Sequence, residues 1–278
     1  MTTRLSVDFR DAAVISAADR GFTYGDGLFE TLRVVGGVTP LWQRHAERLV
    51  AGCERLRMPG PDIAAVHAEL MRLCEGLDDA VVRISYSRGV GERGYVMPSA
   101  PRPTLVVAAS PLALAPEASR DGIAVRLCDM RLAIQPALAG LKHLNRLEQV
   151  LARAEWSDPT VAEGLLLDME GGLVCATAAN LFVVRHGELV TPPVDRCGVA
   201  GVARAEILAS HHVNVSRISV SQLLEADEVF LTSAVRGILP VRAFGARTWQ
   251  PGPVTRALQV HWAALGLPLP YRAKDSDR

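Results

Sequence analysis

The sequence has no apolar run long enough to span a bilayer, and its N-terminus, MTTRLSVDFR, lacks the apolar stretch of a signal peptide. It also lacks an excess of either charge, because 30 basic and 30 acidic residues cancel. The pI is about 7.1, so no overall field attracts the protein to nucleic acid or to an anionic membrane. We expect a cytoplasmic protein with no nucleic-acid partner and no membrane attachment.

The sequence also lacks the spacings of common metal and disulfide sites. Its five cysteines, Cys53, Cys74, Cys128, Cys175 and Cys197, include no CxxC pair, which indicates reduced thiols that mostly fill the core. The seven histidines form neither an HExxH nor an HxH pattern. We therefore expect no metal site.

The chain does contain enough apolar sequence for two domains. It has 278 residues, and 49% of them are hydrophobic. Segments typical of strands and of helices alternate along it, which predicts an α/β (mixed α+β) protein with mixed sheets. Residues 111–121, PLALAPEASRD, are interpreted as the connection between a smaller N-terminal α/β domain (1–112) and a larger C-terminal α/β domain (113–278).

Local patterns predict several elements of the N-terminal domain. Alternation predicts a strand over 28–35, and amphipathic spacing predicts helices over 42–58 and 62–75. Two later strands are separated by RGVGERGYVMPSAPRP, which is too long for a simple hairpin. Loops of this length are usually functional or mobile.

Residues 137–151, ALAGLKHLNRLEQVL, place Lys142 at a predicted junction. Leu144, Leu147, Val150 and Leu151 recur at helical spacing, so the lysine is predicted to stand between a strand and a helix. A desolvated lysine loses its proton readily and is then a nucleophile for carbonyl groups. A lone lysine would otherwise be read as a side chain that reaches from an apolar segment to water.

This segment resembles the cofactor-lysine segment of the fold-type IV pyridoxal-phosphate enzymes, and most of all that of the aminodeoxychorismate lyases among them. Other segments resemble the same family in the same order: DRGFTYGDGLFE, HAERL, SRGVGERGY, AANLF, CGVAGVAR and TSAVRGILPV. The resemblance covers nearly the whole chain. It implies a two-domain fold-type IV enzyme, a homodimer, with pyridoxal 5′-phosphate (PLP) between the domains and the cofactor lysine in the C-terminal domain.

The resemblance also implies which residues bind the cofactor. Lys142 supplies the amine for the aldehyde, and the guanidinium of Arg48 suits the phosphate. Backbone N–H groups at a glycine-rich helix start are a second phosphate contact, and the end of the strand EVFLTS is a third. The residues implied for these last two contacts are Val202, Ala203, Ser233 and Ala234.

The substrate implied by the resemblance carries two carboxylates, so cations and hydroxyl donors are expected around it. The implied substrate-binding residues are Phe29, Glu30, Arg93 and Tyr95. For Glu30 the alternative is a structural acid whose hydrogen bonds are satisfied within the protein. Arg88, in the same loop as Arg93, is expected instead to pair with an acid. Arg236 is a further basic candidate.

One position departs from the family pattern. The family usually has a glutamate at the pyridine nitrogen, five residues before the asparagine of the AANLF-like segment, and here that residue is Cys175. A thiol replaces a carboxylate poorly unless it is ionised. Asp168 and Glu170 are nearby acids, and a ring nitrogen that is unprotonated or bound to water is another alternative.

The implied reaction converts 4-amino-4-deoxychorismate to 4-aminobenzoate and pyruvate in folate biosynthesis, through an external aldimine with Lys142 as general base. Aromatisation drives this step, so it depends less on the pyridinium than transamination does. One alternative is a branched-chain or D-amino-acid transaminase, which predicts a glutamate near the ring nitrogen and a different substrate loop. Another is a non-catalytic PLP-binding protein, and retention of Lys142, Arg48 and Arg93 argues against it.

Overall fold

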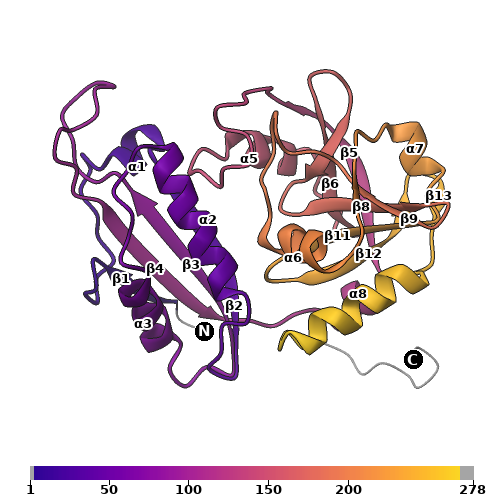
Figure 1. Cartoon of the computed structure of the whole chain (residues 1–278), viewed down its shortest axis with the longest axis horizontal. Coiled ribbons are helices and arrows are strands. Elements are labelled where there is room, and N and C mark those ends of the chain that lie inside the picture. The colour runs from indigo at the N-terminus through magenta and orange to yellow at the C-terminus, as the bar shows by residue number, and fades with distance from the viewer. Residues whose placement is uncertain (1–2, 270–278) are drawn as a thin grey trace. The chain divides into compact units, whose positions relative to one another are not determined.

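The computed structural model describes residues 3–269, which form two compact units (Figure 1). One unit comprises the chain up to Ala113 together with Leu141–Asn145. The other comprises Leu114–Gly140 and the described residues from Arg146 onward. Each unit has its own sheet and its own apolar core. No helix among residues 3–269 is long and apolar enough to cross a membrane.

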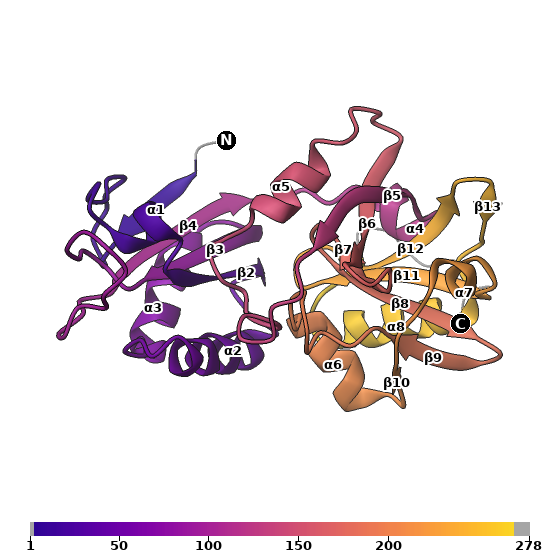
Figure 2. The ribbon, with the colours of Figure 1, turned by 90° about the horizontal axis from the view of Figure 1, so that it is seen from above.

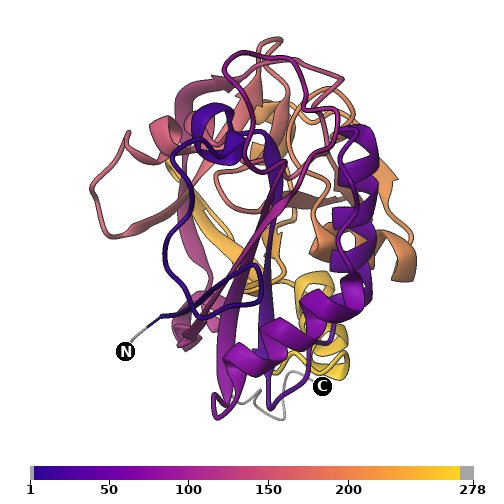
Figure 3. The same cartoon turned by 90° about the vertical axis from the view of Figure 1, so that its left-hand side faces the viewer.

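The first unit is an antiparallel sheet with α2 (Trp42–Arg55) and α3 (Ile63–Cys74) on one face (Figure 2, Figure 3). Its strands are β1 (Arg4–Val7), β2 (Gly27–Val35), β3 (Asp79–Ser87) and β4 (Thr104–Pro111), and a further helix is α1 (Arg20–Tyr24). The strand order is β1-β4-β3-β2. Leu32 of β2, Leu49 of α2 and Leu70 of α3 belong to one buried cluster.

The end of α2 and the start of α3 are both set by local backbone conformation and hydrogen bonds. The predicted helix over 42–58 begins at Trp42 but ends at Arg55, because Arg57 adopts a left-handed φ of 53° and Met58 N–H donates to the Cys53 carbonyl. The predicted helix over 62–75 is observed as α3. Asp62 precedes it, and its carboxylate accepts a hydrogen bond from Ala65 N–H at 3.0 Å.

The second unit is a sheet that closes on itself. Its strands are β5 (Ile123–Leu132), β6 (Val161–Asp168), β7 (Leu173–Ala176), β8 (Asn180–Arg185), β9 (Glu188–Thr191), β10 (Asn214–Val215), β11 (Glu228–Ser233), β12 (Gly237–Phe244) and β13 (Arg247–Thr248). The order runs β10-β9-β8-β11-β12-β5-β6-β7, and β7 also pairs with β8. Because β7 has partners on both edges, the strands from β8 round to β7 form a barrel. Leu165, Leu181, Leu231 and Leu239 belong to one apolar cluster of this unit.

Helices surround this barrel (Figure 1). They are α4 (Pro116–Arg120), α5 (Leu147–Arg153), α6 (Val202–Ser210), α7 (Val220–Leu224) and α8 (Pro253–Ala264). All five cysteines of the chain are free and buried, as predicted. Cys128, Cys175 and Cys197 lie in one cluster with Trp156, on a part of the second unit distinct from the larger apolar core.

The placement of Lys142 corrects the sequence prediction. The lysine was expected in the C-terminal domain, at the end of a strand and the start of a helix. Instead, the segment Leu141–Asn145 belongs to the first unit. It lies along the free edge of β2, where Phe29 N–H donates to the Lys142 carbonyl and Leu144 N–H donates to the Gly27 carbonyl, both at 2.9 Å. These backbone bonds, which sequence patterns do not reveal, tie the lysine to the first unit.

The helix expected directly after Lys142 is also shorter than predicted. It begins only at Leu147, and Leu147, Val150 and Leu151 are 73%, 60% and 56% exposed. The residue of α5 that is buried is Ala152. Helical spacing was therefore correct for the part that forms a helix, but Leu147, Val150 and Leu151 are exposed and only Ala152 joins a core cluster.

Candidate active site

Lys142 lies beside an aromatic ring in the first unit. Its Nζ is 4.1 Å from the centroid of the Phe29 ring, and the guanidinium of Arg83 lies 3.9 Å from the same centroid. Phe29 itself is buried. The structure thus brings together the predicted cofactor lysine and one predicted substrate-binding residue, with Arg83 as a cation that the sequence did not indicate.

Glu30 lies on the opposite face of β2 from Phe29, because successive residues of a strand alternate. Its carboxylate accepts hydrogen bonds from His45 Nδ1 at 2.6 Å and from Arg48 Nε at 2.7 Å, and Arg48 Nη2 also pairs with it. Burial alone would raise the pKa of Glu30, but Arg48 and His45 lower it to about 2. The prediction that Glu30 lines the substrate with Phe29 is therefore not supported, since the carboxylate is buried and occupied.

Arg88 is a structural residue, but not on a solvated loop as expected. It is 2% exposed, and its guanidinium pairs with Asp26 while donating to the Leu56 and Arg57 carbonyls. Arg20, which is 4% exposed, binds the same carboxylate at 2.8 Å. Asp26 therefore pairs with two buried guanidinium groups.

Arg20 also holds the loop that carries the predicted substrate residues. Its Nη1 donates to the carbonyls of Gly94 and Val96, and Gly94 N–H donates to the Tyr24 hydroxyl at 2.9 Å. Arg93 is exposed, and Tyr95 is 86% exposed with its ring 5.5 Å from that of Tyr24. Their predicted contact with substrate stays a prediction.

We expect Asp26→Asn to destabilise the first unit by about 3 kcal/mol, because it leaves two buried guanidinium groups without a countercharge. Urea unfolding would measure the change. The control is Asp121→Asn, which removes an exposed pair with Arg120 at 2.8 Å and should leave the urea unfolding curve nearly unchanged. Equal stability losses for the two variants would show that Asp26 is not the centre of this network.

In the second unit, the predicted phosphate contact is at the start of α6. Gly201 caps α6 without a side-chain hydrogen bond, so first-turn N–H groups such as those of Val202 and Ala203 are available to an anion. Asn180 contacts the loop that leads into this helix. It is buried, its Nδ2 donates to the Val199 carbonyl at 2.9 Å, and a Cβ on Gly201 would lie 2.0 Å from its Oδ1.

The turn between β11 and β12 carries Ser233, Ala234 and Arg236. The Ser233 hydroxyl accepts from Arg236 N–H at 3.0 Å, and the Arg236 guanidinium pairs with Glu163. Glu163 is buried, and its carboxylate also accepts from the Thr177 hydroxyl. Arg236 is thus a half-buried guanidinium held by an acid, beside the predicted phosphate contacts Ser233 and Ala234.

Cys175 is buried in β7 and pairs with Asn180 of β8, at the point where the barrel closes. Burial, reinforced by Cys197 and Glu163, raises the pKa of its thiol to about 12. The thiol is therefore neutral near pH 7 and cannot supply the negative charge of a carboxylate.

The two nearby acids do not replace that carboxylate in this structure. Asp168 accepts from the N–H groups of Glu170 and Gly172, both at 2.9 Å, and pairs with Arg217. Glu170 is exposed and pairs with Arg196 and Arg217. Both acids therefore form hydrogen bonds or ion pairs at the turn between β6 and β7.

Sequence reasoning missed His45, Asn180 and Glu163 as members of these clusters. His45 was within a quoted motif, HAERL, three residues before Arg48, which is the spacing that places two side chains on one face of a helix. Asn180 likewise lies within a family-like segment, AANLF. Glu163 had no such signal, because its partners Thr177 and Arg236 are distant in the chain.

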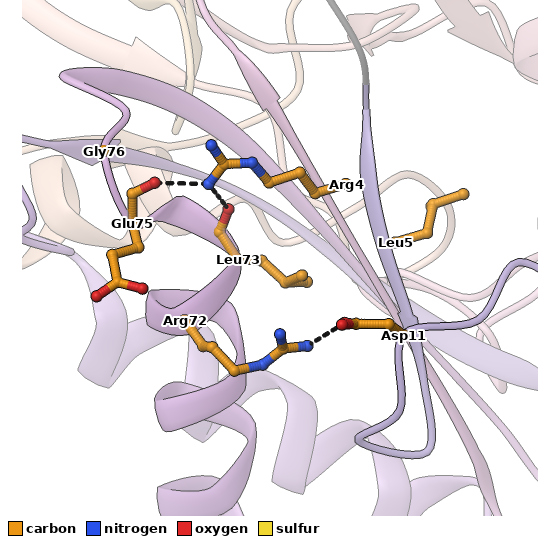
Figure 4. Close-up of a pocket in the computed structure, with 7 residues that line it drawn as sticks. All are labelled: Arg4, Leu5, Asp11, Arg72, Leu73, Glu75 and Gly76. Carbon is orange, nitrogen blue, oxygen red and sulfur yellow. Dashed lines mark hydrogen bonds and ion pairs between the residues drawn. The ribbon is translucent and has the colours of Figure 1, made fainter.

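A separate surface hollow of the first unit is lined by Arg4, Leu5, Asp11, Arg72, Leu73, Glu75 and Gly76 (Figure 4). Arg4 donates to the carbonyls of Leu73 and Glu75, at 2.9 and 2.6 Å, at the end of α3. Arg72 pairs with Asp11 at 2.7 Å. Both guanidinium groups are engaged within the chain, and we assign no ligand to this hollow.

Comparison with known proteins gives the family. The model of the family described as amino-transferase class IV matches residues 27–244. The chain belongs to this family. Class IV aminotransferases are PLP-dependent enzymes that act on small molecules, which confirms the predicted cofactor and the fold-type IV class.

Individual relatives to which this chain is similar include lyases and an aminotransferase. It is 34% identical to an aminodeoxychorismate lyase from Vibrio harveyi over 88% of this chain and 94% of that protein. It is 32% identical to a putative branched-chain-amino-acid aminotransferase from Methanocaldococcus jannaschii over 91% of each. Among solved structures, the 4-amino-4-deoxychorismate lyase from Pseudomonas aeruginosa matches with a TM-score of 0.89 and 46% identity, over 94% of this chain and 98% of that one.

The residues present fit the cofactor of the class IV family. A phosphorylated aldehyde needs an amine and a cradle for its phosphate. Lys142 is a half-buried amine beside an aromatic ring. The start of α6 has no side-chain cap. It follows a loop in which Gly198 has a φ of 82° and Gly201 has no room for a Cβ. Such a backbone cradle suits a phosphate.

Proposed function

We propose that the protein is a lyase that converts 4-amino-4-deoxychorismate to 4-aminobenzoate and pyruvate. The observation that carries this proposal is the 46% identity, over nearly the whole chain, to the Pseudomonas aeruginosa lyase. The match to the Vibrio harveyi lyase, at 34% identity, supports it independently. We further propose, from the resemblance of the sequence to this family, a cytoplasmic homodimer.

Bound PLP would supply the aldehyde that links covalently to the substrate amine and the ring that withdraws electrons from it. Lys142 Nζ would hold the cofactor aldehyde and, as a free amine, would accept the proton from the amine-bearing ring carbon of the substrate. The residues that would hold the phosphate are those implied by the resemblance to the family: Arg48, Val202, Ala203, Ser233 and Ala234. Arg93 and Tyr95 recognise carboxylates, and the Phe29 ring keeps the lysine amine away from water.

Cys175 favours the lyase over a transaminase in this proposal. Because the buried thiol is neutral, it provides no anion that would keep the pyridine nitrogen protonated. Transamination depends strongly on a protonated ring as an electron sink, whereas the lyase step gains from forming an aromatic product. A branched-chain or D-amino-acid transaminase remains the second candidate, supported by the 32% identity to the Methanocaldococcus jannaschii protein.

We expect Cys175→Glu to raise amino transfer by about tenfold or more, because a carboxylate at this position stabilises the protonated ring. The measurement is the single-turnover conversion of the cofactor to its amine form by branched-chain and D-amino acids. Cys175→Gln, of similar size but uncharged, is the matched control. No gain with glutamate over glutamine would count against the assigned place of Cys175.

The test of the function itself is release of pyruvate from 4-amino-4-deoxychorismate by PLP-loaded protein without an amino acceptor. A lyase releases pyruvate under these conditions. A transaminase does not, and it would instead respond to amino acids and 2-oxo acids. A protein that binds PLP but responds to neither would support the non-catalytic alternative.

A further inference from the structure

Glu30 is a buried carboxylate in an apolar setting. It lies on the core face of β2, where its neighbours on the same face, Leu28 and Leu32, belong to the apolar cluster of the first unit, and it is 1% exposed. An apolar side chain of similar size would pack there without the cost of desolvating a charge. The carboxylate is therefore placed for its contacts and not for packing.

Those contacts come from a single turn of α2. Arg48 grips the carboxylate with two groups, Nε to Oε1 at 2.7 Å and Nη2 to Oε2. His45, one turn earlier, donates from Nδ1 to Oε2 at 2.6 Å. The edge of the guanidinium that pairs with Glu30 is the one that carries Nε and Nη2.

His45 has no other polar contact that would explain its burial. It is 1% exposed, and its Nε2 has no hydrogen-bond partner among residues 3–269. Burial, together with the charges of Arg48 and Lys142, lowers the pKa of His45, while Glu30 opposes that change. A neutral ring with its proton on Nδ1 donates one hydrogen bond, and in this structure Glu30 receives it.

We propose that Glu30 and His45 are positioning residues, which fix the guanidinium of Arg48 in the orientation that binds the cofactor phosphate. The inference rests on the proposed function in one respect, the assignment of Arg48 to the phosphate. The backbone of Arg48 is fixed by α2, and its guanidinium is fixed by the carboxylate of Glu30. The carboxylate is in turn fixed by the hydrogen bond from His45. Glu30 of β2 and His45 and Arg48 of α2 thus form one connected group of side chains.

The physical gain is preorganisation. An arginine side chain loses rotamer entropy when it is immobilised. In this arrangement that entropy is already lost when the chain folds. The free energy of cofactor binding therefore does not have to offset the loss. Glu30 also reduces the net positive charge near the phosphate, and a purely electrostatic account therefore predicts that removing Glu30 strengthens phosphate binding.

The experiment compares PLP with pyridoxal, which has the same aldehyde and ring but no phosphate. Apo-protein is titrated with each, using the visible absorbance of the bound aldehyde, for the wild type, Glu30→Gln, Arg48→Gln and His45→Phe. Glu69→Gln is the matched control, since it removes a largely buried acid that pairs with Arg72 at 2.9 Å in the same unit. Phosphorus NMR of bound PLP reports the phosphate environment directly.

We expect Glu30→Gln to weaken PLP binding by about 10- to 100-fold, as for loss of a charge-assisted hydrogen bond. Pyridoxal binding should change by less than about threefold, and the phosphorus resonance should shift toward that of Arg48→Gln. His45→Phe should show a smaller loss of the same kind, and it serves as the test if Glu30→Gln does not fold. Glu69→Gln should match the wild type.

Equal losses for PLP and pyridoxal would mean a merely structural role and would overturn the inference. Unchanged or tighter PLP binding in Glu30→Gln would overturn it as well. If Arg48→Gln showed no phosphate-dependent loss, Arg48 would not be the phosphate residue and the inference would fall with that assignment. The lyase assay is read separately, so a phosphate-specific loss in a protein without lyase activity would support this inference and reject the proposed function.

Discussion

Lys142→Ala is expected to lower lyase turnover by about 1,000-fold or more, because it removes both the amine that carries the cofactor and the general base. The lysine sits beside the Phe29 ring, with its backbone fixed to β2. Alanine leaves those backbone bonds in place. Thermal unfolding should therefore be nearly unchanged, and the loss should be chemical.

The sequence offers a matched control for this variant, because the chain has only two lysines, Lys142 and Lys274. Lys274→Ala should keep full turnover. Borohydride reduction of the PLP-loaded protein should fix the cofactor to the peptide that contains Lys142, which mass spectrometry of a digest can read without ambiguity. Retained turnover in Lys142→Ala, or a label on the other lysine, would contradict the assignment.

Gly201→Ala is expected to weaken PLP binding by about 10- to 100-fold, the equivalent of losing one or two good hydrogen bonds to the phosphate. A Cβ at this position would lie 2.0 Å from Asn180 Oδ1. Asn180 is buried and holds the Val199 carbonyl, so relieving the clash means moving the loop that leads into α6. The first-turn N–H groups of α6 would then no longer face the phosphate.

Gly60→Ala is the control for this substitution, since nothing lies within 4 Å of the Cβ it would add. Equilibrium titration of apo-protein with PLP measures both variants. Gly60→Ala should bind like the wild type. Binding by Gly201→Ala within about threefold of the wild type would show that the α6 start is not the phosphate cradle.

The sequence predicted those features that depend on local pattern or on motif order. The strand β2, the start of α2 and the extent of α3 all follow from residues close together in the chain. The cofactor and the fold class followed from motifs in register. For the strand and the helices the determining side chains are neighbours in sequence, so one stretch of chain contains the whole signal.

The predictions that failed depended on contacts between distant residues. Glu30 was placed with the substrate because it follows Phe29, but α2 captures its carboxylate on the other face of β2. Lys142 was placed in the C-terminal domain because of its position in the chain, but its segment pairs with the edge of β2. The apolar residues of α5 had helical spacing and yet are exposed. Patterns of spacing give periodicity, and only tertiary contacts decide which face is covered.

The central claim is tested most directly by following pyruvate and 4-aminobenzoate together, from enzymatically generated 4-amino-4-deoxychorismate, with PLP-loaded protein and no amino acceptor. The account predicts that the two products appear in equal amounts over many turnovers and that Lys142→Ala forms neither. Absence of both products from properly loaded wild-type protein, with amino transfer to a 2-oxo acid in the parallel assay, would contradict the account and identify a transaminase instead.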